Sequence, residues 1–464
     1  MAEQPRVGLL PLYLALYDEV RPEIRPEMQA FAMRVGDRLS KGGLEVAMAP
    51  VCRLRDEVKT AVTDLTARGV DLLATLHLAY SPSLEAVDAL VASDLPVLLL
   101  DTTPAARFDE TATAEDMMRN HGIHGVQDLA CMLRRRGRDY SLAVGHVDDP
   151  RFLDEVMDFA RAAVAARRLR GMRVLIFGDE FAGMGDFAVP WPTLERTLGI
   201  RARRLPVSAI AVKMGEIADG QVQAEMAADR ERFDCSGLGD EVLRVSDHVG
   251  LAVRALLDEA PAGAFSFNFG SFTPEAGVPT VPFLEASKAM ARGVGYAGEA
   301  DALTAAFVGA LVQGFGDTTF TEMFCPDWRE GSVFMSHMGE CNVALAEGTV
   351  RLVEKDYAFG DVANPAVAVF GVRRGPATLV NLAPGPGGSF DIIACPVEVL
   401  DRGPTAGFAQ VPHYWIRPAE GDLVGMLRRY SEAGGTHHSA LVMGDQTGGL
   451  GQMAGLIGAG YVSV

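Results

Sequence analysis

Val7-Gly8-Leu9-Leu10-Pro11-Leu12 is a short apolar run near the start of the chain, and its pattern recurs through the first third of the sequence. Similar runs follow at residues 44–49, 71–76 and 97–100. Segments with the apolar spacing of helices separate these runs, such as residues 27–39. Strands buried on both faces of a parallel sheet are continuously apolar, and strands that alternate with helices are typical of βαβ units. The sequence therefore predicts a parallel α/β domain over residues 1–138.

A second block of the same kind is expected over residues 139–330. Its strands are predicted at residues 141–145, 173–177 and 264–269. After about residue 330 the predicted strands become shorter, and turn clusters such as Pro384-Gly385-Pro386-Gly387-Gly388 separate them. This pattern of short strands and tight turns favours a small antiparallel barrel or sandwich. We therefore expect a third domain, rich in β-strands, over residues 331–464.

The composition of the chain indicates which partners it does not bind and in which compartment it is expected. The 464 residues carry a formal net charge of −19, which argues against nucleic acid and anionic membranes, because both attract basic surfaces. The six cysteines form no C-x-x-C pair, so we expect reduced thiols in a cytoplasmic protein. The N-terminus lacks the pattern of a signal peptide, and no apolar run approaches the roughly 20 residues of a membrane span.

Four residues of the last third have the chemistry of one metal site: Glu299, Glu322, His337 and His438. Each has an ordinary alternative when taken alone: a carboxylate at a helix start, a salt bridge, a hydrogen-bonded core histidine and a polar loop. Together, two carboxylates and two imidazoles suit a divalent ion such as Mn²⁺ better than a structural zinc. They also leave coordination positions that two neighbouring sugar oxygens can fill. This set predicts an enzyme that moves a proton between adjacent carbons.

Two other motifs have alternative interpretations. The stretch from Asn120 to Asp128 contains His121 and His124 before a helix, which is typical of a loop that faces a ligand. Its alternative is a helix N-terminus with polar capping residues. Gly183-Met184-Gly185 begins a G-x-G-x-x-A pattern after a strand, but prolines at 190 and 192 interrupt the helix that a dinucleotide would need. An NAD-dependent oxidoreductase is therefore a weaker alternative.

The chain resembles a known family of sugar isomerases in four segments: Gly295–Asp301, Thr321-Glu322, Ser336–Glu340 and Ala433–His438. They resemble segments of the L-arabinose isomerase and L-fucose isomerase group, and the arabinose isomerase side is closer. The resemblance implies two flavodoxin-like (Rossmann-like) α/β domains followed by a C-terminal, mainly antiparallel β-barrel-like domain. It also implies that Glu299 and Glu322 are the catalytic glutamates, and that both bind the metal together with His337 and His438.

The same resemblance implies substrate contacts and an assembly. The expected substrate-binding residues are His121, His124, His437 and Phe269. In this family the loop that carries the counterpart of His124 reaches the active site of a neighbouring subunit, within a trimer-based assembly that is often a hexamer. His121 stands where arabinose isomerases commonly have Gln, and Cys325–Trp328 also departs from the family pattern. These departures leave open whether the sugar is a pentose, a 6-deoxyhexose or a C6-modified hexose such as a sulfohexose.

The hypothesis from the sequence is a metal-dependent aldose–ketose isomerase that acts on an open-chain sugar. One of Glu299 and Glu322 would take a proton from C2, and the other would shuttle protons on O1 and O2 through a cis-enediol. Mn²⁺ is the expected ion, with Co²⁺ and Mg²⁺ left open because their ligand types overlap. Glu340 is expected to orient a ligand histidine. The alternative is a non-catalytic sugar-binding or sensor protein on the same α/β scaffold.

Overall fold

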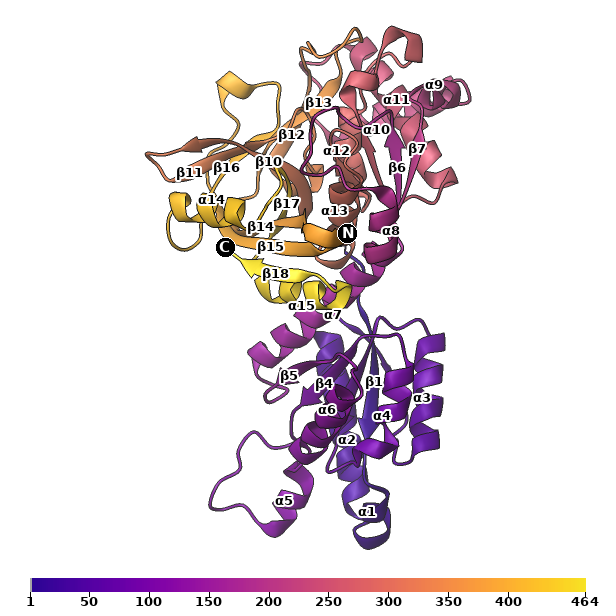
Figure 1. Cartoon of the computed structure of the whole chain (residues 1–464), viewed down its shortest axis with the longest axis vertical. Coiled ribbons are helices and arrows are strands. Elements are labelled where there is room, and N and C mark those ends of the chain that lie inside the picture. Colours follow the sequence, from indigo (N-terminus) through magenta and orange to yellow (C-terminus); the bar gives the residue numbers. More distant parts are fainter. Residues whose placement is uncertain (1) are drawn as a thin grey trace. The chain divides into compact units, whose positions relative to one another are not determined.

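The computed structural model describes residues 2–464 and divides them into two units. The first unit comprises residues 3–164, and the second comprises residues 165–464 together with residue 2 (Figure 1). Helix α7 (Pro150–Arg170) contributes residues to both units. Among the described residues, no helix combines the length and the apolar character that crossing a lipid bilayer requires.

The first unit is built on a parallel five-stranded sheet with the order β2-β1-β3-β4-β5. The strands are β1 (Arg6–Leu12), β2 (Glu45–Met48), β3 (Leu72–His77), β4 (Val97–Asp101) and β5 (Ser141–Val144). The helices before α7 are α1 (Ala15–Val20), α2 (Ile24–Lys41), α3 (Arg55–Ala67), α4 (Val87–Ala92), α5 (Ala114–Asn120) and α6 (Ile123–Arg135). Every residue of β3 is buried, as its continuous apolar run predicts for a central strand.

The assignment of residues 141–145 to the second block was wrong. Strand β5 pairs in parallel with β4, with Leu98 opposite Ser141, so it is the edge strand of the first sheet. An edge strand contacts one neighbour only, and its local pattern does not reveal which sheet that neighbour belongs to. The division of the chain into domains at residues 138/139 and 330/331 stays a prediction.

The second unit begins with a parallel four-stranded sheet of order β7-β6-β8-β9. Its strands are β6 (Arg173–Phe177), β7 (Arg201–Leu205), β8 (Ala264–Phe267) and β9 (Gly295–Ala297). The helices are α8 (Trp191–Leu198), α9 (Ser208–Met214), α10 (Asp219–Arg232), α11 (Asp240–Glu259), α12 (Phe283–Ala291) and α13 (Ala302–Gly314). Helix α13 is apolar and buried on nearly every side, because it contacts this sheet as well as the barrel that follows.

A closed antiparallel barrel completes the second unit. Its six strands follow the order β14-β17-β10-β11-β16-β15, and the pairing of β14 with β15 closes the ring. They are β10 (Thr318–Asp327), β11 (Ser332–Ser336), β14 (Gly375–Pro384), β15 (Phe390–Val399), β16 (His413–Pro418) and β17 (His438–Met443). The other elements are the hairpin β12 (Ala346–Glu354) and β13 (Ala366–Val372), helices α14 (Leu423–Glu432) and α15 (Thr447–Ile457), and β18 (Gly460–Ser463).

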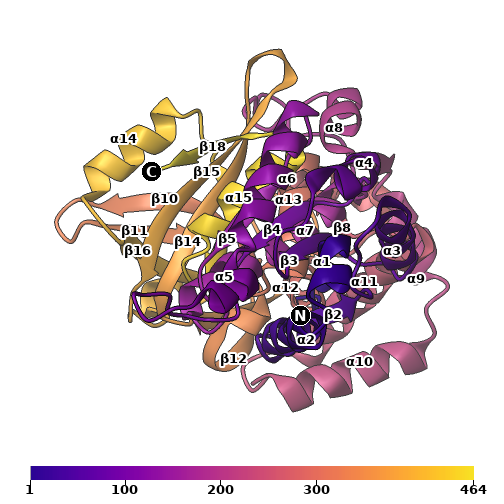
Figure 2. The same ribbon diagram turned by 90° about the horizontal axis from the view of Figure 1, so that it is seen from below.

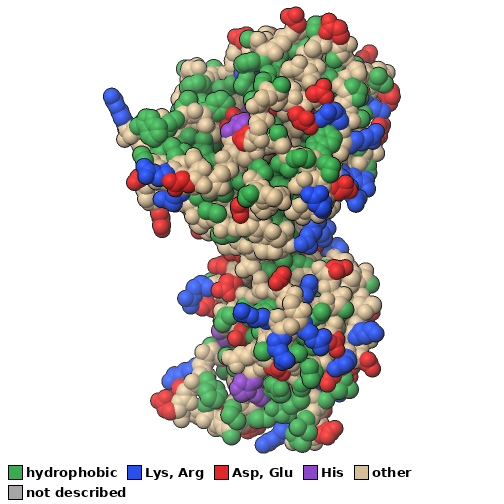
Figure 3. Space-filling model, in the orientation of Figure 1, with side chains coloured by type: hydrophobic (Ala, Val, Ile, Leu, Met, Phe, Trp, Pro, Cys, Tyr) green, Lys and Arg blue, Asp and Glu red, His purple; other side chains and the backbone are tan. Residues whose placement is uncertain are grey.

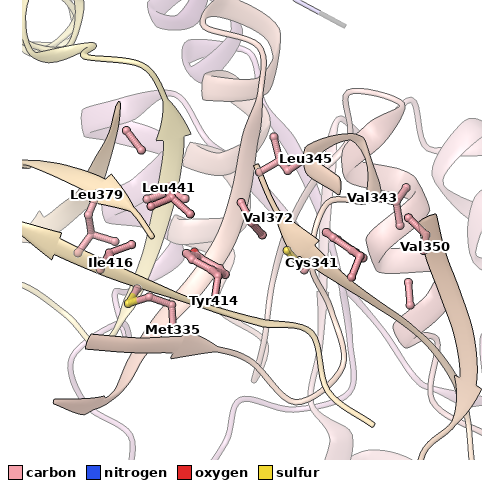
Figure 4. Close-up of a cluster of buried hydrophobic side chains, with 14 of the residues drawn as sticks. Met335, Cys341, Val343, Leu345, Val350, Val372, Leu379, Tyr414, Ile416 and Leu441 are labelled. Carbon is pink, nitrogen blue, oxygen red and sulfur yellow. The ribbon is translucent and has the colours of Figure 1, made fainter. Parts of the chain in front are cut away.

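The barrel strands share a continuous hydrophobic core. Met335, Leu379, Tyr414, Ile416 and Leu441 come from four different strands and belong to one cluster of buried side chains (Figure 4). Helix α14 packs against β15 and β16 on the outside of the barrel (Figure 2). The mixed fold confirms the predicted class, with parallel Rossmann-like sheets followed by an antiparallel barrel.

Candidate metal centre and active site

Glu299, Glu322, His337 and His438 meet at one point of the second unit. Each offers one donor atom, and the four donor atoms all lie within 4.8 Å of one another. The barrel register brings three of them together, because Glu322 on β10 pairs with His438 on one side and with Ser336, the residue before His337, on the other. Glu299 arrives from the parallel sheet, two residues after β9.

The backbone at Glu299 adopts an unusual conformation. Glu299 and Ala300 have φ values of 53° and 67°, a left-handed region that residues other than glycine rarely occupy. Such conformations persist only where the surroundings hold them, and they concentrate at functional sites. The Oγ of Ser266 donates to the carbonyl of Gly298 at 2.9 Å, and the N–H of Phe181 donates to the carbonyl of Glu299 at 3.4 Å. The strained turn thereby holds the Glu299 carboxylate in place.

The shortest contacts within the cluster converge on the Nε2 atoms of the two histidines. The Nε2 of His438 lies 3.0 Å from a Glu299 oxygen and 3.1 Å from a Glu322 oxygen. The Nε2 of His337 lies 3.5 and 3.7 Å from the same two oxygens. The Glu299, His337 and His438 side chains are buried, whereas the Glu322 side chain is 15% exposed and is the most accessible member of the cluster.

A carboxylate contacts the Nδ1 edge of each imidazole ring, on the side away from the Nε2 atoms of the cluster. The Nδ1 of His337 lies 2.7 Å from an oxygen of Glu340, which also accepts hydrogen bonds from the N–H of Gly339 and the hydroxyl of Tyr296. The Nδ1 of His438 lies 2.9 Å from an oxygen of Asp301. A carboxylate on Nδ1 fixes the tautomer in which Nε2 presents a lone pair, and this arrangement recurs around metal-bound histidines.

Asp301 is the partner of the His438 ring, a role that the sequence did not predict. Its Oδ1 accepts from the N–H of Thr304 and caps α13, while its Oδ2 holds His438. The helix-start alternative for Glu299 was therefore wrong, since Asp301 caps the helix and the Glu299 carboxylate points to the histidines. The available signal was a second carboxylate two positions after Glu299, at the position from which an N-cap residue reaches the first turn.

The electrostatics of the cluster favour a cation. Burial opposes the ionised form of Glu299 and Glu322, yet the neighbouring His337 and His438 hold the pKa of both carboxyls below the usual range. Burial likewise opposes a charge on both rings, but the surrounding carboxylates raise the pKa of His337 and of His438 well above normal. Four carboxylates surround the two rings, those of Glu299, Glu322, Glu340 and Asp301. This donor set fits a divalent cation, which would neutralise them.

Aromatic side chains surround the two rings. Phe187 stacks on His438, with ring centres 4.6 Å apart and an interplanar angle of 6°. The ring of Phe320 contacts the rings of His337 and His438 at 4.7 and 5.0 Å. Phe187 also lines a cleft together with Ala300, the neighbour of Glu299. These apolar rings restrict the orientation of the imidazoles and reduce the access of water.

The segment that carries Phe187 includes the glycine pattern weighed for dinucleotide binding. Gly183 and Gly185 lie in the connection between β6 and α8, and α8 begins only at Trp191 with Pro190 as its N-cap. No helix therefore starts at the glycines to receive a pyrophosphate. Instead, Asp186 accepts from the N–H of His437, at 2.9 Å, and contacts the Nδ1 of that ring at 2.6 Å.

The residues expected to bind substrate occupy several places. The His437 ring is 43% exposed, and its Nε2 lies 3.8 Å from Glu322. Phe269 follows β8 in a short 3₁₀ turn (Phe269–Ser271), and its ring contacts Phe181 at 5.4 Å. Both therefore lie in the second unit, near the cluster.

His121 and His124 belong to the first unit, and their ring centres are 5.7 Å apart. His121 contacts the hydroxyl of Tyr17 at 2.9 Å. The capping alternative for this motif was wrong, because the N-cap of α6 is Gly122 and no side chain caps that helix. The motif is also not an extended loop, since only His121 and Gly122 lie between α5 and α6 and His124 belongs to the first turn of α6. That this segment reaches the active site of a neighbouring subunit stays a prediction.

Comparisons with known proteins point to one family. Residues 192–314 match the model of the L-arabinose isomerase central domain, and residues 317–459 match that of the L-arabinose isomerase C-terminal domain. An L-arabinose isomerase of Nocardioides sp. is 28% identical over 90% of this chain and 86% of its own length. Those of Acidothermus cellulolyticus and Mycolicibacterium smegmatis are 25% and 23% identical, over 80% and 91% of this chain and 76% and 86% of their own lengths.

These relatives and the fold define the class of the protein as that of the aldose–ketose isomerases, which are intramolecular oxidoreductases. More narrowly, the chain belongs to the L-arabinose isomerase family. The resemblance carried by the four motifs of the sequence is therefore confirmed, and so is the expectation of an isomerase.

Proposed function

We propose that this chain is a metal-dependent isomerase that interconverts an open-chain aldose and its ketose by proton transfer between C1 and C2 through a cis-enediol. One observation carries the proposal: two carboxylates converge with two imidazole Nε2 atoms. The donor atoms lie within 4.8 Å of one another and belong to Glu299, Glu322, His337 and His438. A protein that only binds sugar has no need of two ionised carboxylates beside two imidazoles.

Glu299, Glu322, His337 and His438 would hold the ion, with Mn²⁺ as the proposed metal and Co²⁺ or Mg²⁺ as substitutes of overlapping ligand preference. When bound, the ion supplies Lewis acidity at the sugar carbonyl and stabilises negative charge on the neighbouring oxygen. Glu340 and Asp301 keep the two rings in the tautomer that presents Nε2, because each accepts the Nδ1 proton.

The two glutamates perform the proton transfers. The lowered pKa values of Glu299 and Glu322 keep both ionised near neutral pH, so each is able to accept a proton. One takes the proton from C2 and delivers it to C1, and the other moves a proton from O2 to O1. Glu322 is the more exposed of the two and lies beside the half-exposed His437, which we propose as a substrate contact.

The apolar side chains around the cluster protect the enediol from water. Phe187 and Phe320 cover the His438 ring, and Phe269 would contact the carbon chain of the sugar. A site with little water strengthens the electrostatic interactions inside it. His121 and His124 would contribute from a neighbouring subunit of a trimer-based assembly in the cytoplasm.

L-Arabinose is the first sugar to test, because the relatives are L-arabinose isomerases. The departures at His121 and at residues 325–328 extend the panel to other pentoses, 6-deoxyhexoses and C6-modified hexoses, including sulfohexoses. The purified protein is stripped with EDTA, reloaded with Mn²⁺, Co²⁺ or Mg²⁺, and assayed for ketose formation. We expect turnover only in the reloaded samples.

Replacing Glu299 or Glu322 with Gln tests the acid–base roles. Each Glu→Gln change should lower kcat by about 10²–10⁴-fold or more, because a positioned proton-transfer group contributes that much. Glu398→Gln is the matched control and should leave kcat unchanged, because the half-exposed Glu398 carboxylate pairs with Arg417 on the barrel surface. Near-normal turnover in E299Q or E322Q would remove that residue from the mechanism. Sugar binding that needs no metal, with no ketose formed, would instead identify a sensor.

A further inference from the structure

The connection between β12 and β13 presents two polar side chains to the interior of the second unit. Lys355 and Tyr357 are each 8% exposed, whereas Asp356 between them is exposed. This alternation of burial means that the side chains of Lys355 and Tyr357 leave the segment on the same, inward face. Hydrogen bonds that Ala363 makes with Pro279 and Thr280 anchor the far end of the same segment.

Lys355 is a largely buried side chain whose amine has no partner. Among residues 2–464, no carboxylate or hydrogen-bond acceptor lies within bonding distance of its Nζ, and the Nζ itself keeps access to solvent while the carbon chain is buried. Burial lowers its pKa, and the nearby Glu340 opposes that effect. Both Glu340 oxygens are already engaged, by the His337 ring, the N–H of Gly339 and the hydroxyl of Tyr296. The chain thus leaves this positive charge without a neutralising contact.

Tyr357 shows the same feature. Its hydroxyl is buried and has no hydrogen-bond partner, although a buried tyrosine hydroxyl usually finds one. The ring packs between Phe283 and Phe359, at 6.1 Å from each. Burial, followed by the charges of Glu340 and Glu299, raises the pKa of the phenol.

A row of aromatic rings connects this segment to the metal cluster. Phe359 contacts Phe269 at 5.8 Å, and Phe269 contacts Phe181 at 5.4 Å. The N–H of Phe181 in turn donates to the carbonyl of Glu299. Aromatic rings bind the C–H faces of sugars, so this row is a suitable surface for the carbon chain between the cluster and the unpaired donors.

We propose that Lys355 and Tyr357 bind the end of the sugar remote from C1 and C2, and that this end carries an anionic oxygen group such as a carboxylate or a phosphate. The proposal rests on the isomerase function proposed above. A neutral hydroxyl would satisfy the phenol but would not pair with the charge of the ammonium group, whereas an anionic group accepts from both donors.

Matched pairs of sugars that differ only at C6 test the proposal on the Mn²⁺-loaded protein. D-Galactose is compared with D-galacturonate and D-galactose 6-phosphate, and D-glucose with its uronate and 6-phosphate. Affinity is measured by isothermal titration, and kcat/KM wherever ketose forms. We expect the wild-type protein to prefer an anionic member by about 10- to 100-fold, the range of a hydrogen bond to a charged group. Comparing the uronate with the phosphate identifies the anion.

Lys355→Met should abolish this preference, and Tyr357→Phe should reduce it by a smaller factor. Lys59→Met, which removes an exposed lysine from α3, is the matched control and should retain it. A second readout needs no sugar: K355M should melt no lower than the wild type, because the Lys355 ammonium group makes no hydrogen bond or ion pair within the chain that the variant would lose. A lysine with a merely structural role would give a lower melting temperature in the variant.

Two results would overturn the proposal: wild-type protein that prefers the neutral member of each pair, or a K355M variant that keeps the anionic preference. The titrations report on this proposal even if no sugar in the panel is isomerised. Absence of ketose from every sugar would instead count against the isomerase function, so the two failures are distinguishable.

Discussion

Asp301 shows how one side chain can link a helix to the metal cluster. Its two oxygens have separate tasks, since Oδ1 caps α13 and Oδ2 accepts the Nδ1 proton of His438. Asn is also a good N-cap residue, so Asp301→Asn preserves the cap. It removes the negative charge beside the ring.

We expect Asp301→Asn to weaken Mn²⁺ binding by about 10- to 100-fold with little change in thermal stability, because partners of ligand histidines typically contribute that much to affinity. A titration of Mn²⁺ into the stripped protein measures the effect. Asp422→Asn is the control, since Asp422 caps α14 in the same way but contacts no histidine. Equal affinities for Mn²⁺ in D301N and D422N would contradict the role of Asp301.

The combination of short motifs, together with their resemblance to a known family, was enough to identify the four cluster residues. It was not enough to identify Asp301 as the partner of His438, which is separated from it by 137 residues. The same holds for Phe187 and Asp186, whose contacts with His437 and His438 depend on how the β6–α8 connection folds back over the barrel. Contacts of this range leave no periodic pattern in the sequence.

At the level of elements, a buried ion network ties helices α10, α11 and α12 together. The Nζ of Lys288 on α12 lies 2.5 Å from Glu225 and 2.7 Å from Asp229 on α10, and 3.3 Å from Asp247 on α11. Burial raises the pKa of Asp247 to about 8, whereas the adjacent cations outweigh burial at Glu225 and lower its pKa to about 2. One ammonium group therefore compensates several buried carboxylates.

Lys288→Met should destabilise the protein by about 3–5 kcal/mol, because removing one partner of a buried ion pair leaves an uncompensated charge. Denaturant unfolding followed by circular dichroism measures the loss. Lys213→Met, which removes ion pairs with the exposed carboxylates of Glu216 and Glu259, should cost far less. A K288M variant as stable as K213M would contradict this prediction. It would mean that Asp247 and the neighbouring carboxylates become protonated without lowering the free energy of unfolding.

The elements themselves were largely predictable, while their pairing was not. Helices α12 and α13 and most strands follow from apolar periodicity, with ends that differ by a few residues. The position of β5 in the first sheet and the closure of the barrel between β14 and β15 depend on hydrogen bonds between distant segments. Local patterns identify a strand but do not identify its neighbour.

At the level of the whole molecule, the surface agrees with the acidic composition. On the face drawn in Figure 3, acidic and basic side chains of the described residues are interspersed and form no extended basic area.

The pH dependence of stability should reflect one buried histidine of the first unit. His77, at the end of β3, contacts the hydroxyl of Ser81 through Nδ1 at 2.6 Å, and its Nε2 has no partner among the described residues. Burial lowers the pKa of His77 from 6.5 to about 3. The unfolded chain therefore binds a proton at a higher pH than the folded chain, and stability falls as the pH decreases below about 6.5.

Between pH 7.5 and 5.5, His77 alone should cost the wild type about 1.4 kcal/mol of unfolding free energy, since each pKa unit corresponds to about 1.36 kcal/mol. His77→Gln cannot take up this proton, so its stability should change less over the same range. Urea unfolding at a series of pH values measures the difference. Parallel pH profiles for the two proteins would contradict this, because they would show that His77 takes up its proton equally in the folded and the unfolded state.

The closed barrel also limits which changes of chain length the protein can tolerate. Glu322 reaches the cluster because β10 is paired on both edges, and successive side chains of a strand point to opposite faces. A single-residue deletion between Thr318 and Thr321 would turn Glu322 away from the histidines or break two ladders of hydrogen bonds. The tip of the β10–β11 hairpin, around Trp328, is exposed and bears no such constraint. Natural length variation in this half of the chain should therefore accumulate at hairpin tips, while the strand leading to Glu322 keeps an invariant length.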